Sequence, residues 1–317
     1  MKNFIKTIKI KNFKCFNSFE LEDLKRVNLI GGKNNMGKTA FMEACYLGLS
    51  TEDERSFFQS LLVLDITRNP LVEFEIIEDS NNFEFKFSDS EIIINDKIMG
   101  LLDFANTLYS IPQKDYNNGI KEITQFYTGK NKPLNIKNKT FISLNNIRDK
   151  FLIECIDEIK LQDKEDELNC LLKQLFNIEK IDVIKNRIML KKDKKFILLS
   201  EFGDGVKHFL NIILALYLNQ NSTIYLDEVE SGIHYLLFDK LWEIILSLSK
   251  EKNVQVFATT HSKECIEAYY KVSKKLNEDN ISFINLSKNK KDEIIGIVFD
   301  RDMFFSEIEQ NHEVRVW

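Results

Sequence analysis

The chain has 317 residues, of which 44% are hydrophobic and 29% are charged, and its formal net charge is -5. These values are typical of a globular protein of one large domain or two lobes, and the few prolines and glycines argue against long disordered linkers. No apolar run approaches the roughly 20 residues of a membrane-spanning helix, and five scattered cysteines predict free thiols in a reducing cytoplasm.

The first third of the chain is predicted to consist of strands around one helix. Residues 4–10 and 27–30 read as strands on either side of a hinge-like segment at 12–19. Residues 38–49 have the apolar spacing of a helix. Three alternating runs with polar turns between them predict an antiparallel meander with one buried face. These runs span 72–78, 83–88 and 91–95.

The rest of the chain is predicted to be mostly helical at first and then to alternate between helices and strands. Residues 98–127 and 144–176 are predicted to be mostly helical, and 180–190 is expected to form a hairpin with 194–199. From Asp204 onward the order of elements predicts a parallel sheet with helices on its faces. The helices are expected at 205–219, 233–250 and 263–276, and the strands at 223–227, 254–259 and 281–286.

Residues 32–39 read Gly-Lys-Asn-Asn-Met-Gly-Lys-Thr, which is a complete phosphate-binding loop. Its glycines let backbone N–H groups turn toward an anion, Lys38 can reach the β- and γ-phosphates, and the Thr39 hydroxyl can bind Mg²⁺. The expected strand before the loop and helix after it complete such an anion site. The chain is therefore predicted to bind a nucleotide, with ATP and GTP both open.

The expected strand at 223–227 ends in two carboxylates, Asp227 and Glu228. Ligands bind at the carboxyl ends of strands in α/β sheets, so Asp227 can hold Mg²⁺ directly or through water. Glu228 can act as the general base for an attacking water. In isolation an acidic turn would be the better explanation, but a phosphate-binding loop needs a carboxylate partner for Mg²⁺.

The expected strand at 254–259 leads into Thr259-Thr260-His261-Ser262. A neutral imidazole at this strand end can hydrogen-bond a γ-phosphate oxygen and the attacking water. The alternative is a structural histidine that caps the helix starting near Ser262.

Residues 201–207, Glu-Phe-Gly-Asp-Gly-Val-Lys, precede a long apolar helix. Gly203 and Gly205 permit a tight turn, after which the helix start presents free N–H groups and a positive dipole end to an anion. A plain N-cap by Asp204 explains the segment equally well. A second anion-binding helix start suggests a composite site that a second copy of the chain completes.

The order of these motifs resembles that of the ABC-type ATPase heads of the SMC, RecF and OLD (overcoming lysogenization defect) group. Residues 8–16 look like the first strand and basic turn of that group, and 27–39 like its Walker A segment. Residues 227–234 look like its Walker B and D-loop, and 259–262 like its switch-histidine loop. The resemblance covers nearly the whole chain and is closest to the ATPase part of OLD-like proteins, often found in bacterial anti-phage systems.

This resemblance implies an α/β fold of the P-loop ABC-type ATPase, with a mixed or parallel core sheet flanked by helices. It also implies an antiparallel β meander lobe and a helical insertion. A single ATPase domain is expected over 1–317, divided into an N-terminal part at 1–98, the insertion at 99–178 and a signature, Walker B and switch-histidine part at 179–317.

The cofactors implied by the resemblance are ATP and Mg²⁺. Glu228, His261 and Lys38 would be catalytic, while Thr39 and Asp227 would bind the metal. The expected nucleotide contacts are Gly32, Asn34, Asn35, Gly37, Lys38, Thr39, Ala40, Gly203, Asp204 and Gly205. The last three would come from the second protomer of a homodimer that closes around ATP.

The chain departs from this group in its signature motif, where Gly203 stands in place of a serine and Ser200 lies three residues earlier. The Q-loop glutamine is open among Gln59, Gln113 and Gln125, and coiled-coil arms are lacking.

OLD nucleases continue into a Toprim nuclease domain, and the stretch after His261 is too short for one. Asp300-Arg301-Asp302 is expected to cap a final helix at 303–309 and not to bind a metal, so a nuclease would be a separate chain.

The sequence thus predicts a cytoplasmic, Mg²⁺-dependent ATPase that dimerises around ATP and gates a partner effector, a nuclease or toxin, or DNA, in bacterial phage defence. The alternative is a nucleotide-dependent sensor or scaffold with little turnover that sequesters and releases an effector. A nuclease in its own right would depend on Asp300. A P-loop kinase would explain neither the helix start at Gly203 nor the histidine loop.

Overall fold

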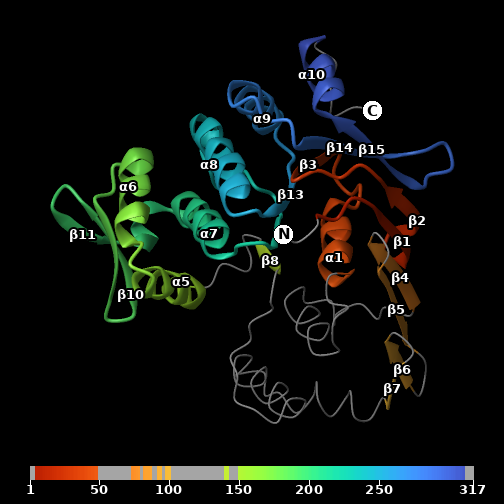
Figure 1. The fold of residues 1–317 in the computed structure, drawn as a ribbon, viewed down its shortest axis with the longest axis horizontal. Coiled ribbons are helices and arrows are strands. Elements are labelled where there is room, and N and C mark those ends of the chain that lie inside the picture. Colours follow the sequence, from red (N-terminus) through yellow and green to blue (C-terminus); the bar gives the residue numbers. More distant parts are fainter. Residues whose placement is uncertain are drawn as a thin grey trace.

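The computed structural model of the chain describes residues 4–48, 73–78, 81–87, 91–94, 97–100, 139–142 and 149–310. At its centre lies a six-stranded sheet in the order β15-β14-β3-β13-β12-β8 (Figure 1). The strands are β3 (Val27–Gly32), β8 (Lys139–Ile142), β12 (Thr223–Leu226), β13 (Gln255–Thr259), β14 (Ile281–Lys288) and β15 (Ile294–Asp300). β15 is antiparallel to β14 and every other pairing is parallel, which confirms the expected mixed sheet.

Helices cover both faces of this sheet. The residues of β12 alternate between the two cores: Ile224 and Leu226 pack with α7, α8 and α9, whereas Tyr225 packs with α1. The helices are α1 (Lys38–Gly48), α7 (Asp204–Leu218), α8 (Phe238–Glu251), α9 (Lys263–Lys275) and α10 (Arg301–Glu309). Because β12 is buried on both faces, its carboxyl end has little freedom to move.

A second six-stranded sheet is antiparallel throughout, in the order β2-β1-β4-β5-β6-β7. Its strands are β1 (Ile8–Phe13), β2 (Phe16–Leu21), β4 (Glu73–Glu78), β5 (Asn81–Phe87), β6 (Glu91–Ile94) and β7 (Lys97–Gly100). The predicted meander is confirmed, but the helix expected from residue 98 is wrong as far as Gly100, where β7 runs. The meander's expected buried face and the rest of the predicted helix lie outside what the structure describes.

The hinge-like segment expected at 12–19 is wrong, because the chain forms a hairpin there. β1 pairs with β2 up to Phe13 opposite Phe16. Asn12 and Lys14 take positive φ values of 54° and 51°, which reverse the chain in a turn that residue alternation does not reveal. The first strand also begins at Ile8 and not at residue 4.

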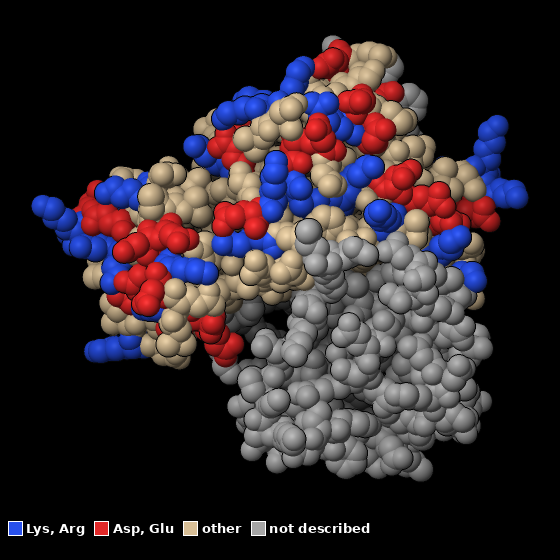
Figure 2. All heavy atoms as spheres, viewed as in Figure 1, with Lys and Arg blue, Asp and Glu red and all other residues tan. Residues whose placement is uncertain are grey.

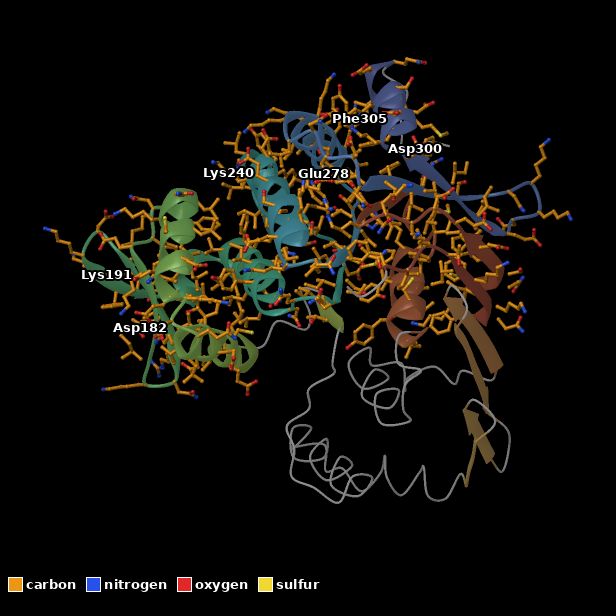
Figure 3. All side chains as sticks on the ribbon, viewed as in Figure 1. Asp182, Lys191, Lys240, Glu278, Asp300 and Phe305 are labelled. Atoms are coloured by element: carbon orange, nitrogen blue, oxygen red, sulfur yellow. The ribbon has the colours of Figure 1, made fainter. Side chains whose placement is uncertain are left out.

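A smaller lobe follows the second of two helices, α5 (Asp149–Leu161) and α6 (Glu165–Phe176). It is a three-stranded antiparallel sheet of β9 (Lys180–Ile184), β10 (Arg187–Lys192) and β11 (Lys195–Leu198). Figure 3 shows Asp182 and Lys191 on this sheet.

Two expectations for this lobe need correction. The single strand predicted at 180–190 is two strands, because Lys185 and Asn186 have φ values of 51° and 60° and form a tight turn. The helix predicted at 144–176 is interrupted near Asp163, whose φ is 53°; residues 144–148 lie outside the described ranges. The hairpin between β10 and β11 is confirmed.

Two helix starts near the carboxyl end of the chain also differ from expectation. The helix predicted from residue 233 begins at Phe238, after a 3₁₀ turn η4 (Tyr235–Leu237) that His234 caps through its ring nitrogen. The final helix begins at Arg301, and Asp300 caps it by accepting a hydrogen bond from the Met303 N–H at 2.9 Å, as expected. Among the helices that the structure describes, none combines the length and apolar character that a membrane span requires.

Candidate functional site

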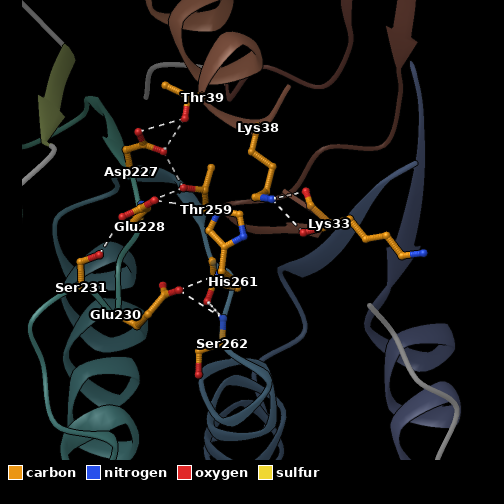
Figure 4. Close-up of polar contacts among 12 residues, drawn as sticks. Lys33, Lys38, Thr39, Asp227, Glu228, Glu230, Ser231, Thr259, His261 and Ser262 are labelled. Atoms are coloured by element: carbon orange, nitrogen blue, oxygen red, sulfur yellow. Dashed lines mark hydrogen bonds and ion pairs between the residues drawn. The ribbon is translucent and has the colours of Figure 1, made fainter. Parts of the chain in front are cut away.

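The phosphate-binding loop joins β3 to α1 and wraps around a buried lysine. Lys38 is 5% exposed, and its Nζ donates hydrogen bonds to the backbone oxygens of Gly32 at 2.8 Å and Lys33 at 2.9 Å (Figure 4). Gly37 has a φ of +77°, and a Cβ at this position would lie 2.8 Å from the Cys15 Sγ. The turn between β1 and β2 therefore packs directly against the loop, and only glycine fits at this point.

The Asp227 carboxylate lies between two hydroxyl groups at the carboxyl edge of the central sheet. Thr39 Oγ1, in the first turn of α1, is 3.2 Å from Asp227 Oδ2. Thr259 Oγ1, at the end of β13, donates to Asp227 Oδ1 at 2.7 Å and accepts from the Glu228 N–H at 2.8 Å. Adjacent parallel strands β12 and β13 thus bring these groups together (Figure 4).

Glu228 and His261 face each other beside this cluster. The Glu228 Oε1 and His261 Nε2 atoms are 3.9 Å apart, and the two side chains are 53% and 37% exposed. Ser231 Oγ donates a hydrogen bond to Glu228 Oε2 at 2.9 Å. Glu228 has a φ of 50°, a conformation that is uncommon for residues other than glycine and that clusters at functional sites.

Burial sets the protonation of the groups around the loop. It lowers the pKa of Lys38 to about 8, against the influence of the Asp227, Glu230 and Glu228 carboxylates. It also lowers the pKa of His261, with the Lys38 ammonium acting in the same direction. Burial raises the pKa of Asp227. A desolvated cation and a desolvated carboxylate side by side are suited to an anionic ligand and a cation, respectively.

The oxygen donors of Thr39 and Asp227 fit a magnesium ion that is shared with a phosphate. Mg²⁺ is usually bound by one or two carboxylates together with phosphate oxygens and water. Within the described residues, no group of three or more His, Cys, Asp and Glu side chains is arranged to hold a metal by itself. The donor set therefore matches Mg²⁺ bound with a nucleotide and not a metal enclosed by protein ligands alone.

The turn at Gly203–Gly205 is a helix start without a side-chain cap. Gly203 occupies the N-cap position and Asp204 is the first helical residue, so the alternative of an N-cap by Asp204 is wrong. No atom lies within 4 Å of the position of a Cβ on Gly203. A Cβ on Gly205, by contrast, would lie 2.0 Å from the backbone oxygen of Gly232, so this helix start packs against the turn that follows Asp227.

The alternative role for His261, as a helix cap, is also wrong. Ser262 caps α9, because its Oγ accepts a hydrogen bond from the Cys265 N–H at 3.1 Å. The histidine side chain is left to face Glu228.

The structure brings most of the predicted site together at one edge of the sheet. Asn34 and Asn35 are exposed in the loop, and Ala40 is buried in the first turn of α1. No described hydrogen bond or ion pair joins Gly203–Gly205 to the phosphate-binding loop of the same chain. The three glutamines considered for the Q-loop, Gln59, Gln113 and Gln125, lie outside the described residues.

Sequence reasoning missed several polar residues that organise this site. Thr259 and Ser231 were adjacent to recognised motifs, but nothing in their spacing indicated which carboxylate they contact. Lys14, in the turn between β1 and β2, forms an ion pair with the buried carboxylate of Glu43 on α1. This pair depends on a hairpin that the sequence did not predict.

Two proteins of similar sequence are an ATP/GTP phosphatase and an uncharacterized protein. The chain is 28% identical over 325 residues to an "ATP/GTP phosphatase" of Helicobacter pylori, a match that covers 83% of this chain and 86% of that protein. It is 43% identical over 58 residues to an uncharacterized protein of Methanocaldococcus jannaschii, covering 18% of this chain and 26% of that one.

SMC head domains are among the solved structures that resemble the chain. An SMC head bound to the C-winged helix domain of ScpA has a TM-score of 0.56 at 11% identity, covering 94% of this chain and 98% of that one. An SMC head from Pyrococcus furiosus, bound to the C-terminal domain of ScpA, has a TM-score of 0.50 at 12% identity, covering 98% and 100%. These likenesses confirm the predicted P-loop ABC-type α/β fold.

A family model described as "AAA domain, putative AbiEii toxin, Type IV TA system" matches residues 27–267. The match includes the phosphate-binding loop, Asp227, Glu228 and His261, and it spans well over half of the chain. The chain therefore belongs to this family of AAA domains.

Proposed function

We propose that the chain binds ATP with Mg²⁺ and hydrolyses it in a homodimer. The observation that supports this most directly is the meeting of the groups that hydrolysis needs at one sheet edge. Thr39 Oγ1 is 3.2 Å from the Asp227 carboxylate, and Glu228 faces His261 at 3.9 Å. The "ATP/GTP phosphatase" of Helicobacter pylori supports the reaction class.

Lys38, Thr39 and Asp227 would bind the phosphates and the metal. The Lys38 ammonium is desolvated and forms no ion pair with a carboxylate of the described residues, so a phosphate would be its natural partner. Thr39 and Asp227 would hold Mg²⁺, which on binding neutralises phosphate charge. Thr259 orients the carboxylate through its hydrogen bond to Asp227 Oδ1.

Glu228 and His261 would carry the hydrolytic step. Glu228 accepts a proton from the attacking water as the water oxygen bonds to the γ-phosphorus. The bond from that phosphorus to the β–γ bridging oxygen breaks, and ADP and phosphate leave. Because burial lowers the pKa of His261, its imidazole is neutral at pH 7 and donates a hydrogen bond to a γ-phosphate oxygen.

The helix start at Gly203 supports a dimeric site. Its N–H groups lack a side-chain cap, and the space around Gly203 is open. Within one chain this start has no described contact with the phosphate-binding loop. Gly203–Gly205 of the partner subunit would therefore cover the nucleotide through backbone groups and the helix dipole.

The Glu228→Gln substitution tests this proposal. Loss of the base should lower ATP turnover by at least about 100-fold, while ATP still binds and dimers accumulate. Turnover is followed by phosphate release, and dimers by light scattering with and without ATP. Glu267→Gln, on the exposed face of α9, is the control. Unchanged turnover in Glu228→Gln would contradict the role of Glu228 as general base. Full activity in a monomer would contradict a site that two subunits share.

The output of the cycle would be the gating of a separate effector, a nuclease or toxin, or of DNA, in bacterial phage defence. The OLD-like motif order and the toxin named in the family description support this setting. On the described part of the face shown in Figure 2, acidic and basic side chains are interspersed, so this face does not single out DNA over a protein effector. Co-purification with Glu228→Gln in the presence of ATP would identify that effector, and recovery of the protein alone would count against it.

A nucleotide-dependent sensor with little turnover is the second candidate. The absence of a hydroxyl side chain at Gly203, where the related signature motif has serine, favours it. Ser200 does not replace that serine at the helix start, because it lies in the 3₁₀ turn η3 (Leu199–Phe202) before Gly203. Turnover of the isolated protein, measured with and without DNA, separates the two candidates.

A further inference from the structure

Glu230 connects the two members of the catalytic pair, although neither motif includes it in a catalytic role. Its Oε1 accepts hydrogen bonds from the backbone N–H groups of His261 at 2.6 Å and Ser262 at 3.2 Å (Figure 4). Both donors belong to the segment between β13 and α9. Glu230 itself lies in the turn after β12, two residues beyond Glu228.

The turn that carries Glu230 is held by its own backbone. The Ser231 N–H donates to the Glu228 oxygen at 2.9 Å, and the Ile233 N–H donates to the Glu230 oxygen at 3.0 Å. The Val229 N–H donates to the Thr259 oxygen at 3.0 Å, which ties the turn to β13. These bonds set the position of Glu230 relative to Glu228. The Glu230 carboxylate can therefore fix the histidine segment in a defined position relative to Glu228.

The second oxygen of Glu230 indicates that this arrangement is not optimised for stability alone. Oε2 is buried and has no hydrogen-bond partner among the described residues. A buried acceptor without a partner costs free energy, and such costs are found where the surroundings impose a geometry that function requires. The geometry imposed here is the pair of bonds from Oε1 to the His261 and Ser262 amides.

We propose that Glu230 is a positioning residue that holds the His261 imidazole opposite Glu228, an inference that rests on the proposed ATP hydrolysis. Glu230 acts on the backbone of the histidine segment and does not touch the reacting atoms. An acceptor oxygen is what the role requires. Glutamine retains such an oxygen at the same reach, whereas alanine has none.

Hydrogen exchange tests the positioning without any turnover. In Glu230→Ala the amides of His261 and Ser262 should exchange faster than in the parent, while the amides of β12 and β13 keep their protection. Glu230→Gln should retain most of the protection at both amides. Glu267→Ala removes a carboxylate from the exposed face of α9 and should leave the His261 segment unchanged.

Kinetics test whether the positioning matters for hydrolysis. Glu230→Ala should lower kcat by about 10- to 100-fold, because a displacement of about 1 Å in a reacting group has effects of this size. The affinity for ATP should stay within about threefold, because Glu230 makes no contact with the phosphate-binding loop. Glu230→Gln should recover most of the lost kcat, which Glu228→Gln cannot do.

Three outcomes would overturn the proposal. Unchanged exchange at His261 and Ser262 in Glu230→Ala would show that the carboxylate does not hold the segment. A loss of kcat in Glu230→Gln as large as in Glu228→Gln, with the amides still protected, would show that its charge and not its acceptor oxygen matters. Lost protection with unchanged kcat in Glu230→Ala would show that the contact between Glu230 and the histidine segment has a structural role only.

Failure of the proposed function would look different. A parent protein without ATP turnover would remove the proposed hydrolysis, while the exchange experiment would still decide whether Glu230 holds the segment. If Glu230→Ala loses protection throughout the chain, Glu230→Asp replaces it, because the shorter side chain keeps the charge but cannot reach both amides. It should then expose His261 and Ser262 selectively, and uniform protection there would refute the role.

Discussion

Two helix starts in this chain are proposed to face the phosphates of a nucleotide, and they differ in what surrounds them. The start of α1 is enclosed, with Lys38 only 5% exposed and Gly37 packed against Cys15. The start of α7 is open, with no side-chain cap and no atom within 4 Å of a Cβ on Gly203. In the proposed dimer, the first would hold the phosphates within its own chain, and the second would reach a nucleotide that is bound to the other copy.

Other helix starts differ from α7 to different degrees. Ser262 caps α9 and Asp300 caps α10 through their own side chains, whereas α6 and α8 also begin without a side-chain cap. A side-chain cap of this kind satisfies one of the four free N–H groups of a helix start and places an oxygen atom in front of the others, which makes the start less open to a phosphate. The start of α7 is the element on which the proposed dimeric site depends, because it is uncapped and packs against the turn that follows Asp227.

Removing the enclosed lysine should have the largest effect. Lys38→Met should weaken ATP binding by about 100-fold or more, because two charge-assisted contacts of about 1.5 kcal/mol each are lost. Binding is measured by calorimetry in Mg²⁺. Lys271→Met, on an exposed side chain of α9, should bind ATP as the parent does. Equal affinity in the two variants would contradict the enclosed site.

The same substitution predicts a change in the pH dependence of nucleotide-free stability. Burial lowers the pKa of Lys38 from 10.5 to about 8, so the unfolded chain binds more protons than the folded one between these values. The free energy of unfolding should therefore rise with pH across that window. Lys38→Met should lack this rise in urea unfolding experiments, and an identical pH profile in both proteins would refute the assignment.

At the open helix start, substitution by alanine should have different effects at the two glycines. Gly205→Ala should lower turnover by about 10-fold or more, because its Cβ would lie 2.0 Å from the Gly232 oxygen and must displace the turn next to Glu228. Gly203→Ala meets no atom within 4 Å, but its φ of +85° and ψ of 164° lie in a region that is used essentially by glycine alone, at a cost of about 1–3 kcal/mol of stability. Turnover and urea unfolding of both variants check this, and equal turnover would remove the link between helix start and base.

The pH dependence of turnover should report the neutral histidine. Burial lowers the pKa of His261 from its ordinary value of 6.5, so the neutral form predominates at pH 7. The value of kcat should be level between pH 7 and 8 and should fall only as pH drops through the lowered pKa. His261→Gln should remove that acidic limb. A kcat that rises steadily from pH 7 to pH 8 would contradict a neutral imidazole.

The capped helix start of α10 should give the smallest effect. Figure 3 places Asp300 where β15 meets α10, and Asp300→Ala should cost about 1 kcal/mol of stability, the usual value for an N-cap. ATP turnover should not change. Mg²⁺-dependent DNA cleavage that disappears in this variant would contradict the cap and revive the nuclease reading.

Most of the individual motifs could be predicted because each is local. The phosphate-binding loop, the Asp227–Glu228 pair and the histidine segment are short runs with distinct chemistry at strand ends. The alternation of helices and strands after Asp204 also predicted a parallel sheet correctly. The antiparallel β15 and the edge strand β8 were not foreseen, because nothing in a short apolar run states which neighbour it will pair with.

The hairpin of β1 and β2 and the turn at Lys185–Asn186 were missed for a related reason. Their lysines and asparagines take positive φ values of 51° to 60° in tight turns. These residue types also occur outside turns, so their presence did not indicate one. Glu230 shows the same limit in the site itself. Its acidic side chain was visible beside Asp227 and Glu228, but its target is a backbone segment about thirty residues away.

The sequence by itself determined which chemical groups the proposed site contains: a lysine and a threonine, two carboxylates and a histidine, each at the end of a recognisable element. Tertiary structure alone decided how they are oriented. It set Thr259 between Asp227 and the Glu228 amide, and it set Glu230 beneath His261. Composition and spacing act along the chain, whereas hydrogen bonds between neighbouring strands and turns depend on which segments the folded sheet brings side by side.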